Sequence, residues 1–186
     1  MAQTMRSCVP RMRGFTLIET LVALAVLAVL LGLAVPGFAR LRQEQQLQAS
    51  AEAFWNSLML ARAHAMLERQ HVSLCTLSSS GACDAGLDWH AGWLVFVDGN
   101  RNGQREPDEI LLQQQPPTAL GLRITGNSTV AHAVGYGAEG RSETLTGAFQ
   151  AGTVSFCAPG LPEGWRVVIN ALGRPRIERH APAACL

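Results

Sequence analysis

The feature that most constrains this chain is a nearly uninterrupted apolar stretch close to the N-terminus, GFTLIETLVALAVLAVLLGLAVPGF. As a helix rising about 1.5 Å per residue, Phe15 to Val35 would span roughly 30 Å, the thickness of a bilayer hydrocarbon core. A secretory signal peptide has a shorter apolar region, with its cleavage site behind it. Here the candidate cleavage point, Gly14, precedes the apolar run. We therefore expect the run to remain in the mature chain as a transmembrane helix.

One acidic residue, Glu19, lies inside this apolar run. A carboxylate at membrane depth is costly unless it finds a partner, so Glu19 is a functional candidate. With cleavage after Gly14, the new N-terminal amine would be that of Phe15, and Glu19 could reach this amine on a neighbouring subunit. The segment before Gly14 contains arginines and no acidic residue, which favours cytoplasmic retention of that end.

The helical pattern continues beyond the apolar run to about Gln70. Gly32, Pro36 and Gly37 predict a kink or partial melting on the way. Beyond them, apolar or small residues recur at alternating spacings of four and three, which predicts one narrow face packed against a sheet. These residues are Leu47, Ala51, Phe54, Leu58, Ala61 and Ala65.

From about His71 the pattern changes to short β-type runs separated by Gly, Asn, Asp and Pro. The runs are HVSLCTL, GWLVFV, EILLQQ, LRIT, TVSFC, WRVVIN and RPRIE. Their short connections predict an antiparallel sheet that packs one face on the helix. The fold class is therefore α+β, with a leader at 1–14, a transmembrane helix half at 15–36, an amphipathic helix half at 37–70 and a β-rich globular head at 71–186.

The residues from Gly14 to Glu19, GFTLIE, are similar to the class III signal of type IV pilins and type II secretion pseudopilins. The resemblance implies a type IV pilin fold, cleavage after Gly14 by a prepilin peptidase and N-methylation of Phe15. It also implies assembly with other major and minor pilins through Glu19. The chain would cross the inner membrane once, with its head in the periplasm, and would be extracellular when assembled in a pilus.

Three further stretches resemble the GspH/FimT family of minor pilins and pseudopilins. They are LQASAEAFWNSLMLARAHAMLERQHVSLC, WHAGWLVFVDGNRNG and the final strand pair. This resemblance covers nearly the whole chain.

Four cysteines remain if the leader is removed, an even number. There is no Cys-x-x-Cys pair and no His at zinc-finger spacing, which predicts two disulfides in an oxidising compartment. Four cysteines allow three pairings. We expect Cys75–Cys83 and Cys157–Cys185, because each pair would join neighbouring strands.

The sequence contains no catalytic signature. The five histidines form no metal-ligand spacing, and neither HExxH nor GxSxG occurs. We therefore expect a non-enzymatic protein without a cofactor.

One segment, DGNRNGQREPDE, matches the calcium-loop pattern D-x-[DN]-x-[DN]-G-x5-E. The matching residues are Asp98, Asn100, Asn102, Gly103 and Glu109. The flanking segments are strand-like, so the helices of the usual motif are missing. We favour an Asx-rich turn between two strands, with calcium binding as the alternative.

Positive charge collects at the C-terminus, where four arginines against one glutamate follow Trp165. In an extended strand alternate side chains share a face, so Arg174 and Arg176 would point the same way. Pro175 between them favours an edge strand or a loop beside one, and Arg179 could join them if the chain leaves the strand there. Such a solvent-facing fork suits the phosphates of a nucleic-acid backbone. The alternative is a solvated edge strand whose arginines oppose aggregation.

The segment Gly173-Arg174-Pro175-Arg176 resembles the C-terminal G-R-x-R motif of FimT-like pilins, which bind DNA during natural transformation. The resemblance implies non-specific binding of double-stranded DNA through Gly173, Arg174 and Arg176, with Arg179 assisting. The alternative is a structural role without DNA binding, as a FimU-like priming minor pilin or a GspH-like type II secretion pseudopilin.

Overall fold

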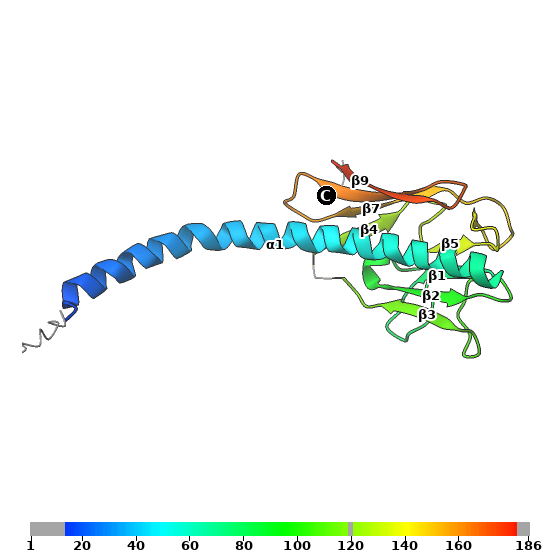
Figure 1. Cartoon of the computed structure of the whole chain (residues 1–186), viewed down its shortest axis with the longest axis horizontal. Coiled ribbons are helices and arrows are strands. Elements are labelled where there is room, and N and C mark those ends of the chain that lie inside the picture. Colours follow the sequence, from blue (N-terminus) through cyan, green and yellow to red (C-terminus); the bar gives the residue numbers. More distant parts are fainter. Residues whose placement is uncertain (1–13, 119–120, 182–186) are drawn as a thin grey trace, which may run out of the picture. The chain divides into compact units, whose positions relative to one another are not determined.

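The computed structural model describes residues 14–118 and 121–181. One long helix, α1 (Leu17–Glu68), begins in a unit that ends at Arg40 and continues into a second unit that begins at Leu41. We call the second unit the head (Figure 1). The partial melting expected at Gly32, Pro36 and Gly37 is wrong, because α1 is assigned as helix throughout, and the kink expected there stays a prediction. A proline removes only one hydrogen bond from the ladder, and the helix is maintained on both sides of it.

The first part of α1 has the character of a membrane span. Its apolar side chains are exposed, among them Leu21, Leu24 and Val29. An 18-residue window of α1 has a mean hydropathy of 2.6 and is 0% buried, so the helix is long and apolar enough to cross a bilayer.

Within the head, α1 buries the narrow face that its residue spacing predicts. All six residues of that face are at most 1% exposed. Three of them, Ala51, Ala61 and Ala65, have small side chains, so the neighbouring elements can approach the helix axis closely. The prediction of a helix face packed on a β-rich head is confirmed.

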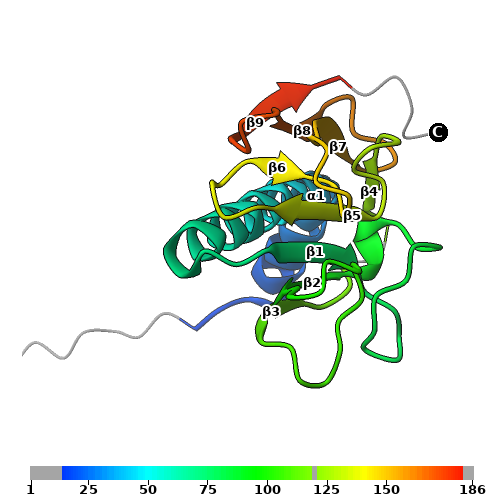
Figure 2. The ribbon, with the colours of Figure 1, turned by 90° about the vertical axis from the view of Figure 1, so that its right-hand side faces the viewer.

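The head contains two antiparallel sheets rather than the one expected (Figures 1 and 2). The first sheet has the order β3-β2-β1-β5-β6 and the second has the order β4-β7-β8-β9. The strands of the first sheet are β1 (Val72–Thr76), β2 (Trp93–Val97), β3 (Leu111–Gln115), β5 (Ala133–Tyr136) and β6 (Ser142–Glu143). Those of the second are β4 (Arg123–Gly126), β7 (Gly152–Cys157), β8 (Gly164–Ile169) and β9 (Pro175–His180). A short 3-10 helix, η1 (Trp89–Ala91), precedes β2.

Both sheets share one core against α1, and Phe54 lies at its centre. The Phe54 ring makes edge contacts with Trp89, Trp93 and Phe156, at centroid distances of 5.0, 5.3 and 5.8 Å. The indole N–H of Trp93 donates to Ser57 Oγ at 2.9 Å, and that of Trp89 donates to the carbonyl of Val130 at 2.9 Å. The aromatic core is therefore fully buried without leaving these two donors unpaired.

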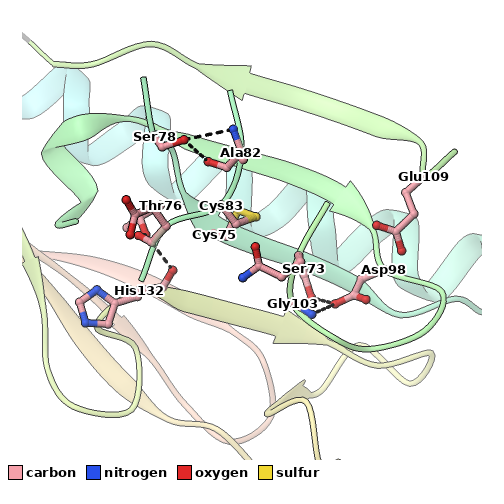
Figure 3. Close-up of a disulfide and its surroundings, with 12 residues drawn as sticks. Ser73, Cys75, Thr76, Ser78, Ala82, Cys83, Asp98, Gly103, Glu109 and His132 are labelled. Atoms are coloured by element: carbon pink, nitrogen blue, oxygen red, sulfur yellow. Dashed lines mark hydrogen bonds between the residues drawn. A yellow bond between two sulfur atoms is a disulfide. The ribbon is translucent and has the colours of Figure 1, made fainter. Parts of the chain in front are cut away.

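A disulfide joins Cys75 of β1 to Cys83, the pair expected from the sequence (Figure 3). It closes the loop that follows β1, and Leu77 and Cys83 pair there as an antiparallel bridge. Cys75, Leu77, Leu94 and Phe96 form a second, smaller buried cluster beside it. Cys157 is also in a disulfide, but its predicted partner Cys185 lies outside the described residues, so that pairing stays a prediction.

Replacing Phe54 by Ala should lower the free energy of unfolding of the head by about 3–5 kcal/mol, because the ring is buried among three aromatic side chains. Leu67 of the same helix is 80% exposed, and Leu67→Ala should change stability by no more than about 0.5 kcal/mol. Urea unfolding of the head from Leu41 onward measures both. Equal losses in the two variants would contradict this description of the core.

Candidate functional site

The arginine-rich segment begins at the turn between β8 and β9. The amide of Gly173 donates to the carbonyl of Asn170 at 2.9 Å. The side-chain oxygen of Asn170 accepts hydrogen bonds from the amides of Leu172 and Arg174, at 3.2 and 3.0 Å. An Asx turn of this kind fixes the backbone that carries Arg174.

Gly173 has two separate reasons to be glycine. Its φ is +72°, a conformation that residues with a Cβ adopt at a cost. A Cβ at this position would also overlap the carbonyl oxygen of Gly140 and come within 3.0 Å of the Tyr136 ring. The same Gly140 carbonyl accepts a hydrogen bond from Arg62 Nε of α1 at 2.9 Å. Gly173 thus fits the turn against the β5–β6 connection, which α1 holds in place.

β9 lies at the edge of the second sheet, as the proline in its sequence predicts. Pro175 is its first residue, and the Pro175 carbonyl accepts a hydrogen bond from the indole N–H of Trp55 at 3.1 Å. Trp55 belongs to α1, so the helix supports the start of the arginine strand directly. Trp55 and Arg176 both line a groove of about 540 Å³ between the helix and β9.

The outward face of β8 and β9 brings together two arginines and one glutamate. Glu178 is directly opposite Arg166 in the strand register, and Arg176 precedes Glu178 by two residues on the same face. Glu178 Oε2 accepts hydrogen bonds from Arg166 Nε at 2.8 Å and is 2.6 Å from its terminal nitrogen. Glu178 Oε1 accepts one from Arg176 Nε. We call Arg166, Arg176 and Glu178 the arginine–glutamate triad.

The charges of the triad stabilise one another. Hydrogen bonds from Arg176 and then Arg166 hold the pKa of the Glu178 carboxyl below its ordinary value. The side chains of Arg166, Arg176 and Glu178 are 37%, 61% and 28% exposed. The lowered pKa favours the ionised form of Glu178, and all three side chains are open to solvent.

Arg174 is exposed and has no acidic partner among the described residues. It lies between the Gly173 turn and the start of β9 at Pro175, two residues before Arg176. Arg174 and the triad contribute three guanidinium groups and one carboxylate from β8, β9 and the turn between them. Sequence reasoning missed Arg166, because its approach to Arg176 depends on the pairing of β8 with β9.

Arg179 is not part of this group. β9 continues to His180, so the chain does not leave the strand in a way that would turn Arg179 toward Arg176. Arg179 lies over the Trp165 ring, 5.3 Å from its centroid, and 3.7 Å from a carboxylate oxygen of Glu163. Its neighbours are therefore on the opposite face of β8 and β9, where Trp165 packs on the core.

The oxygens of the calcium-loop residues accept hydrogen bonds from within the protein, and Figure 3 shows those that Asp98 accepts from Ser73 and Gly103. Asp98 is fully buried and accepts from Ser73 Oγ at 2.6 Å and from the amides of Asn102 and Gly103, each at 3.0 Å. The Asn100 and Asn102 side-chain oxygens accept from backbone amides, and both Glu109 oxygens do the same. These hydrogen bonds form an Asx-rich turn between two strands, which is the interpretation that the sequence favours.

Metal binding by this loop stays a prediction of the sequence pattern. No group of three or more His, Cys, Asp or Glu side chains is placed to hold a metal within 14–118 and 121–181.

The predicted processing and assembly residues lie at the start of α1. Gly14 has open space around it, and Phe15 is 81% exposed. The amide of Glu19 donates to the hydroxyl of Thr16 at 3.3 Å, which places Glu19 in the first turn of the helix. Cleavage after Gly14, methylation of Phe15 and assembly through Glu19 remain predictions.

A long N-terminal helix, apolar in its first half and packed on antiparallel sheets in its second, is the type IV pilin fold. The amino-acid sequence identifies the group more closely. Residues 50–173 match the family Type II transport protein GspH, and residues 10–35 match the prokaryotic N-terminal methylation motif. The first match covers more than half of the chain, so the protein belongs to the GspH family. No curated protein matches the chain.

Solved structures share the fold. The minor pilin FimU of Pseudomonas aeruginosa is 23% identical, with a TM-score of 0.59 over 77% of this chain and 98% of FimU. The minor pseudopilin EpsH of Vibrio cholerae is 13% identical, with a TM-score of 0.50 over 75% of this chain and 99% of EpsH. At these identities the likeness establishes the fold alone.

Family membership has three consequences. The protein is a structural component and not an enzyme. The family implies assembly with other pilins and processing by a prepilin peptidase. The methylation motif and the apolar helix are those of a prepilin anchored in the inner membrane.

Gly173→Ala should destabilise the head by at least about 1 kcal/mol more than Gly160→Ala does. Gly160 has a similar φ of +83° but open space around its Cβ position. The pair therefore separates the close approach to Gly140 from the cost of the backbone conformation. Thermal or urea unfolding measures the stability of both variants. Equal losses of stability in Gly173→Ala and Gly160→Ala would show that the close approach to Gly140 does not contribute.

His71 should make the stability of the head depend on pH. It is 5% exposed, and burial lowers its pKa from the ordinary value of 6.5, although Asp98 and Glu143 lie nearby. The unfolded chain then binds a proton at higher pH than the folded chain, so stability is lost as pH falls below about 6.5. His71→Gln should reduce the difference in unfolding free energy between pH 7.5 and 5. His90→Gln, at an exposed position, should leave that difference unchanged.

Proposed function

We propose that this GspH-family protein is a minor pilin that captures extracellular double-stranded DNA through Arg174 and Arg176. The observation that supports the proposal is the exposed arginine group at the β8–β9 edge. Arg174 is open to solvent without an acidic partner among the described residues, and Arg176 is 61% exposed beside it. The Gly173 turn and the Trp55 hydrogen bond hold both arginines on a rigid support.

The chemistry of the edge suits phosphates rather than bases. A guanidinium is a planar fork that matches a phosphate group with two parallel hydrogen bonds. Contacts of this kind position a protein on DNA without reading its sequence. So few cations predict weak, salt-sensitive binding, with a dissociation constant of roughly 10⁻⁴–10⁻⁶ M for one head.

Useful capture would then depend on several heads acting together. Binding sites linked in one filament raise the effective concentration of each for the same DNA molecule. The predicted processing at Gly14 and Phe15 and assembly through Glu19 would supply that filament, carrying the head from the periplasm to the cell exterior.

Replacing Arg174 and Arg176 together by Ala should lower the affinity of the head for a labelled duplex at least tenfold, because two phosphate contacts are lost. Fluorescence anisotropy at about 50 mM salt measures the affinity. Arg42→Ala/Arg69→Ala removes the same charge from exposed positions on α1 and the residue that follows it, and it should have a smaller effect. Equal affinities for the wild type and the Arg174/Arg176 variant would refute the proposal.

A role in filament assembly is the second candidate. It is supported by the family model, named for a type II transport protein, and by the shared fold of the minor pilin FimU. Under this alternative the protein is a priming subunit or a pseudopilin, and deleting its gene abolishes filaments or secretion. Under the DNA-capture proposal, cells carrying only the Arg174/Arg176 variant keep their filaments and lose transformation.

A further inference from the structure

The arginine–glutamate triad contains an anion already bound by the protein itself. Two nitrogens of Arg166 approach Glu178 Oε2, at 2.8 and 2.6 Å, and Arg176 Nε donates to Oε1. A carboxylate held by two nitrogens of one guanidinium and one nitrogen of a second uses both of its oxygens as acceptors, as the two free oxygens of a phosphodiester would in its place. Arg176, one of the two arginines proposed to contact DNA, therefore has a competitor within its own strand.

We propose that Glu178 occupies the position of a DNA phosphate, and that Arg166 is a further DNA-contacting residue which Glu178 covers in the free protein. The inference rests on the proposed function, because it concerns what happens at the same surface when DNA arrives. On binding, a backbone phosphate takes the place of the Glu178 carboxylate between Arg166 and Arg176. Glu178 thereby lowers the affinity of the site.

The geometry allows this exchange. All three side chains of the triad are partly exposed, so a phosphate can approach without any movement of the core. Ion pairs at such exposed positions are weak in water, so a phosphate can displace the carboxylate. Arg174 has no acidic partner among the described residues and can make the first contact before the exchange takes place.

The opposite face of the same two strands offers a matched control. Arg179 and Glu163 also form an ion pair, at 3.7 Å, with side chains that are 72% and 65% exposed. Glu163→Gln therefore changes the net charge by the same amount as Glu178→Gln, and Arg179→Ala by the same amount as Arg166→Ala. Only the triad variants alter the proposed DNA surface.

The test measures binding of a labelled duplex by the full-length chain in detergent micelles at about 50 mM salt. Glu178→Gln should bind about 3–10-fold more tightly than the wild type, and this gain should shrink as salt screens the charges. Arg166→Ala should bind about 3–10-fold more weakly, and its plot of log affinity against log salt should be shallower by about 0.9. Glu163→Gln and Arg179→Ala should stay within twofold of the wild type. Circular dichroism and a melting curve establish that each variant is folded.

A second measurement keeps the inference testable if Glu178→Gln or Arg166→Ala is unstable. In spectra of the arginine side-chain N–H groups of the wild type, a short duplex should shift the signals of Arg166 and Arg176. The Arg179 signal should remain where it is. A signal from Arg166 that does not respond to DNA would overturn the inference.

Failure of this inference differs from failure of the proposed function. If the wild type binds DNA through Arg174 and Arg176, but Glu178→Gln binds no better or Arg166→Ala binds equally well, only the inference is wrong. A weaker Glu178→Gln would show that Glu178 positions the arginines instead of competing with DNA. If no variant binds DNA, including Glu178→Gln, both proposals are wrong.

Discussion

The burial of one narrow face of α1 between two sheets is the constraint on which the rest of the head depends. Phe54 is the central contact, because its ring contacts residues of both sheets and of η1. Each sheet alone would expose an apolar face to water, and the helix face closes both into a single core. The alanines of that face allow the close approach, and the aromatic side chains fill the remaining volume.

The flanks of the same helix position the candidate DNA surface. Trp55, next to Phe54, donates its indole N–H to the first residue of β9. Arg62 donates to the carbonyl of Gly140. Gly173 lies against the same carbonyl, where a side chain would not fit. The β8–β9 turn is therefore fixed from two sides, and its arginines extend from rigid backbone. Affinity for a polyanion is gained when cations are held in place in advance, since less side-chain freedom is lost on binding.

The sequence predicted the features that depend on local spacing. The buried face of α1 follows from alternating steps of four and three, and the edge position of β9 follows from Pro175. The two shortest strands of the first sheet, β5 and β6, were not predicted, because AVGY contains a glycine and Ser142–Glu143 is too short to show alternation. The division into two sheets was not predicted either, since it depends on pairing between strands far apart in the sequence, such as β1 with β5 and β4 with β7.

The candidate site shows the same limit. Arg174 and Arg176 could be chosen from their two-residue spacing alone, and that spacing also places Glu178 beside Arg176. The involvement of Arg166 depends on the cross-strand register, and the separation of Arg179 depends on the strand continuing to His180.

The measurement that tests the account most directly is the salt dependence of DNA affinity for the wild type and Arg174→Ala. If Arg174 contacts a phosphate, the slope of log affinity against log salt becomes shallower by about 0.9 in the variant. Identical slopes and affinities would contradict the assignment of this surface to DNA.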